Sequence, residues 1–295
     1  MTEQRRLAVR HETIYEYPDA VEVAHHSARL RPRDSAWQAV HDWCLAIHPA
    51  PDCAVQQSLD AFGNWRHGFS HARVHERLQV VSSFQVVLSR PSVAPASSPP
   101  WEQVAQILRY HAGTQQPEAV AFWLGTPFAP QDPRLAAFGE GLFTPGRPLA
   151  ELAAALMERI HERLRYEPLS TDVATSALDV LFRRMGVCQD FAHLMIGVLR
   201  SQGLAARYVS GYLLTQPSSG PARLVGADAS HAWVAVWCPQ QGWIALDPTN
   251  NMAAGLDHVT VAWGRDYADV APLRGVIRGG GVAEPSVAVS VERVD

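Results

Sequence analysis

Residues 1–90 carry short runs in which apolar and polar positions alternate. The clearest of these runs are residues 7–13, 21–24, 45–48 and 80–88. Residues rich in proline, glycine and asparagine separate them, as at positions 49–52 and 62–64. A period of two is typical of strands that bury one face. We therefore expect a β-sandwich-like domain over residues 1–90.

The pattern changes after this segment. Residues 91–150 begin with a stretch rich in proline and serine, which reads as a linker, and continue as a helical region broken by prolines. Apolar spacing predicts an amphipathic helix over residues 149–164 and a short helix over residues 176–182. We expect a second domain over residues 151–275. Residues 276–295 form a C-terminal unit in which positions 287–294 alternate again and predict a strand, at a sheet edge or returning to the N-terminal domain.

A buried helix is predicted to begin near Cys188. Residues 191–199 are apolar apart from His193, and Gly203 supplies a stop signal. Cys188 then lies in the first helical turn, where unpaired N–H groups and the helix dipole favour an anion. A cysteine at such a position is a candidate nucleophile because only its thiolate form attacks.

Two strands follow, over residues 231–237 and 242–247, with turn-forming residues between them. A hairpin centred on Pro239 would place His231 directly opposite Asp247, with both side chains on one side of the sheet. A strand over residues 206–214 would complete an antiparallel sheet against which the Cys188 helix packs. His193 is five residues after Cys188, so at about 100° per residue it faces away from the thiol. We interpret it either as a core histidine or as one that supports a catalytic residue without contacting substrate.

These motifs resemble the transglutaminase-like superfamily of papain-like thiol enzymes, in its bacterial branch with an N-terminal β domain. The resemblance rests on GVCQDFAHLMIGVLRSQGLAARYVSGYL, DASHAWVAVW and GWIALDPTNN, and on VRHETIYEYPDAVEVAHHSARLRPR and LDAFGNWRHGFS in the N-terminal half. It implies an α+β chain whose papain/transglutaminase-like core packs a nucleophile-bearing helix on an antiparallel sheet. It also implies that Cys188 is the nucleophile, His231 the general base and acid, and Asp247 the group that orients the imidazole.

The resemblance further implies acyl transfer to, or hydrolysis of, a carboxamide or peptide bond through a Cys188 thioester. The enzyme would then be a cysteine acyltransferase that cross-links, or a cysteine protease or amidase, and its substrate a peptide or protein. Whether water or an amine accepts the acyl group stays open. The alternative is a catalytically silent peptide- or protein-binding module on the same fold. Alkylation at pH 6 separates the two, because an activated Cys188 would react before Cys44, Cys53 and Cys238.

Other residues around the predicted site allow more than one interpretation. An oxyanion could be stabilised by the Cys188 backbone N–H and by Tyr166. Asp190, in the first helical turn, is interpreted as structural. Asp228 is either a solvated loop residue or a cleft residue that receives an amine. Three tryptophans either pack in the core or line a substrate cleft: Trp233, Trp237 and Trp243.

Composition bears on the number of domains, the partners, the location and the cofactors of the protein. With 295 residues, 47% of them hydrophobic, the chain can form two packed units. Its net charge of −4 favours neither DNA nor RNA as a partner. No apolar leader or membrane-spanning run follows the N-terminus, so we expect a cytoplasmic protein without membrane contact. Four cysteines without paired spacing, and thirteen histidines without an HExxH motif, favour neither metal nor cofactor. The oligomeric state is left open.

Overall fold

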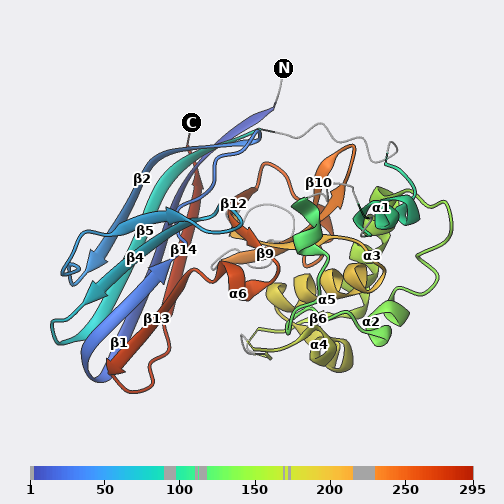
Figure 1. Cartoon of the computed structure of the whole chain (residues 1–295). Coiled ribbons are helices and arrows are strands. Elements are labelled where there is room, and N and C mark those ends of the chain that lie inside the picture. The colour runs from blue at the N-terminus through green and yellow to red at the C-terminus, as the bar shows by residue number, and fades with distance from the viewer. Residues whose placement is uncertain are drawn as a thin grey trace.

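The computed structural model describes residues 3–89, 98–109, 112, 118–168, 170–171, 174–214 and 230–294. It contains a β domain that holds the N-terminus and a mixed domain in which helices lie against a second sheet (Figure 1). The α+β fold class is therefore confirmed. Most of the predicted linker, residues 90–97, lies outside the described residues. Among the described residues, no helix is both long and apolar enough to cross a bilayer.

The N-terminal sheet is organised around one long strand. The strand order of the sheet is β2-β5-β1-β4-β3. The long strand is β1, which pairs with β5 along its first part and with β4 along its last part. Burial alternates along β5, which is why the sequence pattern had a period of two. The strands are β1 (Gln4–Ala28), β2 (Gln38–His48), β3 (Gln56–Leu59), β4 (Trp65–His71) and β5 (His75–Ser89).

The C-terminal segment belongs to the same sheet. Strands β13 (Leu273–Gly279) and β14 (Ser286–Arg293) both pair with β1 in antiparallel fashion. In Figure 1 these two strands lie beside β1, so the chain begins and ends in one domain. The second domain is thus inserted between strands of the first, which anchors it at both ends.

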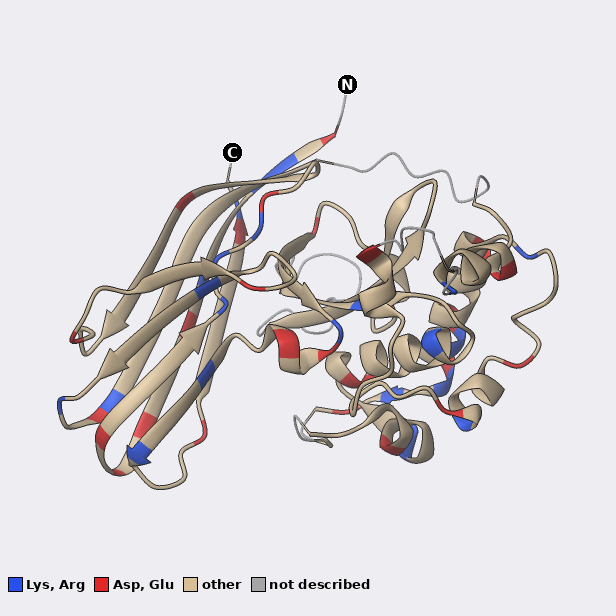
Figure 2. Cartoon of the chain, viewed as in Figure 1, with Lys and Arg blue, Asp and Glu red and all other residues tan. Residues whose placement is uncertain are grey.

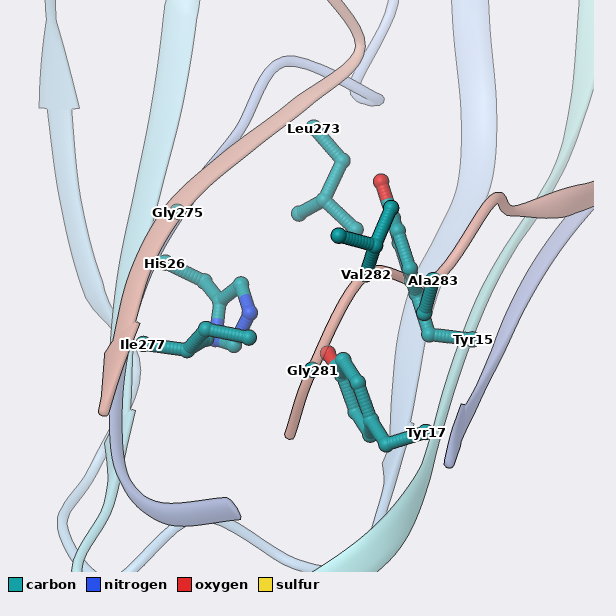
Figure 3. Close-up of a pocket in the computed structure, with 9 residues that line it drawn as sticks. All are labelled: Tyr15, Tyr17, His26, Leu273, Gly275, Ile277, Gly281, Val282 and Ala283. Atoms are coloured by element: carbon teal, nitrogen blue, oxygen red, sulfur yellow. The ribbon is translucent and has the colours of Figure 1, made fainter. Parts of the chain in front are cut away.

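A cavity of about 270 Å³ lies in this domain where β1, β13 and residues 281–283 meet. Figure 3 shows His26 and Ile277 on one side of it and Tyr15 and Tyr17 on the other. Gly275 makes room for the His26 ring, because a Cβ at this position would lie 2.5 Å from ring carbon Cδ2. The cavity walls come from the β domain alone and include none of the predicted catalytic residues.

The second domain carries the helices that the apolar spacing predicted. The amphipathic helix α3 spans Leu149–Arg163, and the short helix before the thiol, α4, spans Ala177–Arg183. Helix α5 spans Cys188–Ser201 and is buried along almost its whole length. The remaining helices are α1 (Trp101–Leu108), the 3-10 helix η2 (Glu118–Phe122), α2 (Pro133–Phe138) and α6 (Tyr267–Val270).

Helix α5 lies on one face of a five-stranded sheet with the order β11-β10-β9-β8-β12. Its apolar residues share a core with Val234, Val236 and Leu246, which point to that face. Trp233 packs in a separate cluster on the opposite face. The strands are β8 (Ala206–Leu213), β9 (His231–Cys238), β10 (Gly242–Asp247), β11 (Met252–Ala253) and β12 (His258–Gly264), and the pair β6 (Arg165–Tyr166) and β7 (Met185–Gly186) lies apart.

Two carboxamide side chains of the β domain attach to the outer strand β12. Gln38 donates to the Thr260 carbonyl at 2.7 Å and accepts from the Thr260 N–H at 2.8 Å. Asn64 donates to the Trp263 carbonyl at 2.8 Å and accepts from the Trp263 N–H at 3.0 Å. Because each amide satisfies a donor and an acceptor, the edge of β12 is paired much as a further strand would pair it.

We expect Asn64→Ala to lower the free energy of unfolding by roughly 2–3 kcal/mol, because the N–H and the carbonyl of Trp263 each lose their hydrogen bond to Asn64. Asn64 is fully buried, so the substitution removes these hydrogen bonds at a position shielded from bulk solvent. Urea unfolding of the full chain would measure the loss. The matched control is Gln57→Ala, which removes an exposed amide from β3 and should change stability by less than about 0.5 kcal/mol. Equal stability of the two variants would contradict this role of Asn64.

Stability should fall as the pH drops from about 6.5 to 4, because several buried histidines are neutral in the fold. Their folded pKa values lie below the unfolded value of about 6.5, so the unfolded chain binds more protons in this range and acid favours it. Urea midpoints at pH 7 and pH 5 would measure the difference, and His26→Phe should reduce it. Identical midpoints would contradict the prediction. Burial lowers the pKa of His11, His26 and His67 to about 4 and that of His193 to about 3.

Candidate active site

The helix that carries the candidate nucleophile begins at Cys188, as predicted. The Asp190 carboxylate holds this turn, since Oδ2 accepts from the Val187 N–H at 2.8 Å and from the Thr171 hydroxyl at 2.6 Å. Gly186 permits this close approach, because a Cβ there would lie 2.5 Å from Asp190 Oδ2. Asp190 therefore has the structural role that was expected of it, and Cys188, partly exposed, occupies the first position of the helix.

His231 and Asp247 meet, but through a different strand register from the predicted one. Nε2 of His231 lies 2.8 Å from Oδ2 of Asp247. The β9–β10 hairpin pairs Cys238 with Gly242, so its turn is centred on Gln240 and not on Pro239. The prediction of a directly opposite pair was wrong by two residues. A shift of two keeps both side chains on one face, where diagonal neighbours still touch.

The Asp247 carboxylate is completely buried and accepts several hydrogen bonds. Oδ1 receives the backbone N–H groups of Thr249 at 3.0 Å and Asn250 at 3.2 Å. Oδ2 receives His231, the Asn250 side-chain amide at 2.8 Å and a second imidazole, His258, at 3.2 Å. Burial acts to raise the pKa of Asp247, but the hydrogen bonds from both histidines outweigh it and hold the pKa well below its usual value. Asp247 is therefore a carboxylate at neutral pH.

The contact with Asp247 also shifts the pKa of His231, and it shifts it upward. Burial acts to lower its pKa, while the hydrogen bond with Asp247, the neighbouring Cys188 sulfur and the Asp247 charge together raise it well above its usual value. Nε2 is committed to Asp247, and Nδ1 has no hydrogen-bond partner within normal geometry in the described part of the chain. The ring therefore has one nitrogen held by the acid and one left for exchange with a nearby thiol.

Tyr166, the predicted oxyanion donor, lies beside the segment that leads into the thiol. It is in β6, where it pairs with Gly186, two residues before Cys188. Burial and then the charge of Cys188 raise the pKa of its phenol, so the hydroxyl keeps its proton at neutral pH. Its role as an oxyanion donor beside the Cys188 N–H stays a prediction.

His193 is a core residue, which was one of the two roles expected of it. It is completely buried, stacks on Phe128 and accepts a hydrogen bond from the Tyr267 N–H at 3.2 Å. Burial lowers its pKa to about 3, so it is neutral. His193 is therefore not an alternative to His231 as the general base.

All three tryptophans pack against other side chains, and a cleft role for the half-buried Trp237 and Trp243 stays a prediction. Trp233 is 1% exposed, which leaves it no surface for a substrate cleft, so that interpretation is corrected to core packing. Trp243 lies against Phe122 and stacks on the Arg207 guanidinium, 4.2 Å from its ring centroid. Trp237 packs against two apolar clusters. Asp228, the other predicted cleft residue, lies outside the described residues.

Sequence reasoning missed His258 and Asn250, which both bind the Asp247 carboxylate. Asn250 stands in the quoted motif GWIALDPTNN, three residues after the acid, and this short spacing could have suggested it. His258 is eleven residues away at the start of another strand, and an alternating strand pattern does not single it out.

The two histidines and Asp247 also place three possible metal ligands within 4.8 Å of one another. The donor set does not fit a metal well. The Gly255 N–H donates to Nδ1 of His258 at 3.3 Å, so the proton of this ring is on Nε2, where a metal would need a free electron pair. We therefore interpret the cluster as a hydrogen-bond network.

Charges are spread over both domains. Figure 2 shows ribbon segments coloured for Arg interspersed with segments coloured for Asp and Glu. The exclusion of nucleic acid as a partner stays a prediction from composition.

Two family models match this chain. A model described as the transglutaminase-like superfamily matches residues 137–248, and one described as the bacterial transglutaminase-like N-terminal region matches residues 7–87. The first match contains the candidate thiol, imidazole and carboxylate, and the second covers most of strands β1 to β5.

Two of the similar proteins cover nearly the whole chain, and a third covers part of it. An uncharacterized protein of Mycobacterium tuberculosis is 40% identical over 276 residues, which cover 92% of this chain and 87% of that protein. An uncharacterized protein of Mycobacterium leprae is 34% identical and covers 98% of this chain and 99% of its own length. A protein-glutamine gamma-glutamyltransferase of Pseudomonas aeruginosa is 39% identical over 132 residues, which are 41% of this chain but 20% of that protein.

A solved structure shares the arrangement of both domains. The crystal structure of a suggested cysteine protease from Cytophaga hutchinsonii superimposes with a TM-score of 0.77. The alignment covers 100% of this chain and 93% of that chain at 19% sequence identity. At this sequence identity the similarity shows a shared fold alone.

Proposed function

Because this chain belongs to the transglutaminase-like superfamily, we propose that it is a thiol enzyme acting on carboxamide or peptide bonds. Cys188, His231 and Asp247 would form its catalytic triad. One observation carries the proposal: Asp247 holds Nε2 of His231 at 2.8 Å, which leaves Nδ1 for a thiol at the start of α5. Nucleophile, base and orienting acid are then all present in one site.

In the first step the Cys188 thiolate attacks the carbonyl carbon of the amide, and a carbon–sulfur bond forms. The carbonyl oxygen takes the negative charge, for which the Cys188 N–H and the Tyr166 hydroxyl are the proposed donors. As the carbon–nitrogen bond breaks, His231 gives its Nδ1 proton to the departing amine or ammonia. The product is an acyl thioester on Cys188.

In the second step water or an amine attacks the thioester, and His231 accepts the proton of the attacking group. The carbon–sulfur bond breaks and the thiolate returns. Asp247 stays ionised throughout, because its hydrogen bonds keep its pKa low. It serves to keep the ring in the tautomer that can exchange a proton at Nδ1.

The experiment is an acceptor assay on the full chain. The protein is incubated with a glutamine-containing peptide library and a fluorescent primary amine, while ammonia release, amine incorporation and peptide cleavage are measured together. The chain contains no lysine, so labelling of its own side chains through lysine amines cannot compete. Incorporation identifies an acyltransferase, ammonia without incorporation an amidase, and shorter peptides a protease.

In each case the product should disappear after treatment with iodoacetamide at pH 6, which should modify Cys188 ahead of the exposed Cys44 and Cys53. A chain that forms none of the three products, and whose Cys188 reacts no faster than Cys44 and Cys53, would overturn the proposal. It would favour a binding module on the same fold.

A further inference from the structure

Asp247 is shared by two imidazoles, and the second of them is His258. Its Nε2 lies 3.2 Å from the same oxygen, Oδ2, that binds His231. Both rings are buried, and their centroids are 6.4 Å apart. His258 is therefore the third side chain, after His231 and Asn250, that holds this one carboxylate oxygen.

The tautomer of His258 follows from its other nitrogen. The Gly255 N–H donates to Nδ1 at 3.3 Å, so Nδ1 accepts and cannot carry the proton of a neutral ring. The proton is on Nε2 and is donated to Asp247. His258 therefore acts as a donor with a fixed direction.

The position of His258 is set from several sides. Its ring meets the Trp233 ring edge to face, with centroids 5.3 Å apart. Between β9 and β12 lies Gly211 of β8, where a Cβ would lie 2.0 Å from the Val259 carbonyl oxygen and 2.5 Å from the Trp233 ring. A residue without a side chain at this point lets the Trp233 ring lie across β8 toward His258.

The β domain fixes the strand that carries His258. Gln38 pairs with the backbone of Thr260, two residues farther along β12. Arg5 forms an ion pair with Asp257, the residue before His258. The donor that reaches Asp247 thus stands on a strand held by the N-terminal domain.

We propose that His258 is a positioning residue for the triad, which holds the Asp247 carboxylate in the orientation that aligns His231 with Cys188. This inference rests on the proposed function. With His258 bound to Oδ2, the carboxylate cannot turn away from His231 without breaking a second buried hydrogen bond. Without His258, the imidazole would be held less firmly and would stabilise the thiolate less well.

The test is the rate at which iodoacetamide alkylates Cys188 in the full chain between pH 5 and pH 9. Gln places an amide nitrogen near the position of Nε2, whereas Asn places it near Nδ1 and does not reach Asp247. We therefore expect H258N and H258F to react about tenfold more slowly than the wild type at pH 6. H258Q should stay within about threefold. All variants should converge near pH 9, where a free thiol ionises unaided.

The control is His161→Phe. His161 binds the Thr249 carbonyl at 2.9 Å and so contacts the segment after Asp247 without touching the carboxylate. Its alkylation profile should match that of the wild type. Thermal unfolding of every variant checks folding, and the Gln and Asn variants, which differ only in reach, decide the matter if H258F does not fold.

Equal alkylation rates for H258Q and H258N at pH 6, both matching the wild type, would overturn the inference and leave His258 a packing residue. Failure of the proposed function has a different signature. In that case Cys188 of the wild type would react at pH 6 no faster than Cys44 and Cys53.

Discussion

Cys188→Ala should reduce turnover by at least about 10⁴-fold, because the thioester cannot form without the sulfur. The free energy of unfolding should change by less than about 1 kcal/mol, since alanine favours a helix and the position is partly exposed. The acceptor assay and urea unfolding of the same preparation would measure both quantities. Loss of activity together with an intact fold is the expected result.

Two other cysteines provide controls for this variant. Cys44 is exposed, and Cys44→Ala should leave both activity and stability unchanged. Cys238 is fully buried in β9, so Cys238→Ala should cost stability while the reaction continues. A Cys188→Ala protein that still converts its substrate at the wild-type rate would remove Cys188 from the mechanism.

Asp247→Asn should reduce turnover by about 10³ to 10⁴-fold with a native-like fold. Both carboxylate oxygens accept N–H donors, so the amide nitrogen of asparagine would face a donor at either position. If it faces His231, the ring must place its proton on Nδ1, where it can no longer accept a proton from the thiol. The alkylation rate of Cys188 at pH 6 and the acceptor assay would both report this change.

Asp60 offers a matched carboxylate for this second variant. It accepts hydrogen bonds from the Phe62 and Asn64 N–H groups and from Arg29 in the β domain. Asp60→Asn should therefore cost stability in a similar way while turnover stays within about threefold. If Asp247→Asn and Asp60→Asn lose activity equally, the loss reflects general destabilisation and not the tautomer of His231.

Much of the fold could be predicted because it follows from local patterns. The start of α5 at Cys188 was evident from the apolar run after it, and the strands β9 and β10 from their composition. Helix propensity, strand alternation and turn residues act over a few neighbouring positions. Helices and strands of this kind can therefore be predicted from short segments of sequence.

The register in which the strands pair was harder to predict from the sequence. A turn centred on Gln240 instead of Pro239 moves the register by two residues, and the choice depends on how the whole hairpin packs. The prediction that His231 and Asp247 share a face survived, because an even shift preserves the side of each residue. For Trp233 the sequence left core packing and a cleft position open, and the structure decides for core packing, because its burial depends on elements distant in sequence.

The sequence by itself determined the candidate catalytic groups. These are a thiol at the start of a helix, and an imidazole and a carboxylate on one face of a hairpin. Only the tertiary structure brought His258 to Asp247 and joined Gln38 and Asn64 to β12. These contacts join positions as far apart as residues 38 and 260, where no periodicity connects them. Local energetics select which face a side chain occupies, whereas packing of whole strands and domains selects its neighbours.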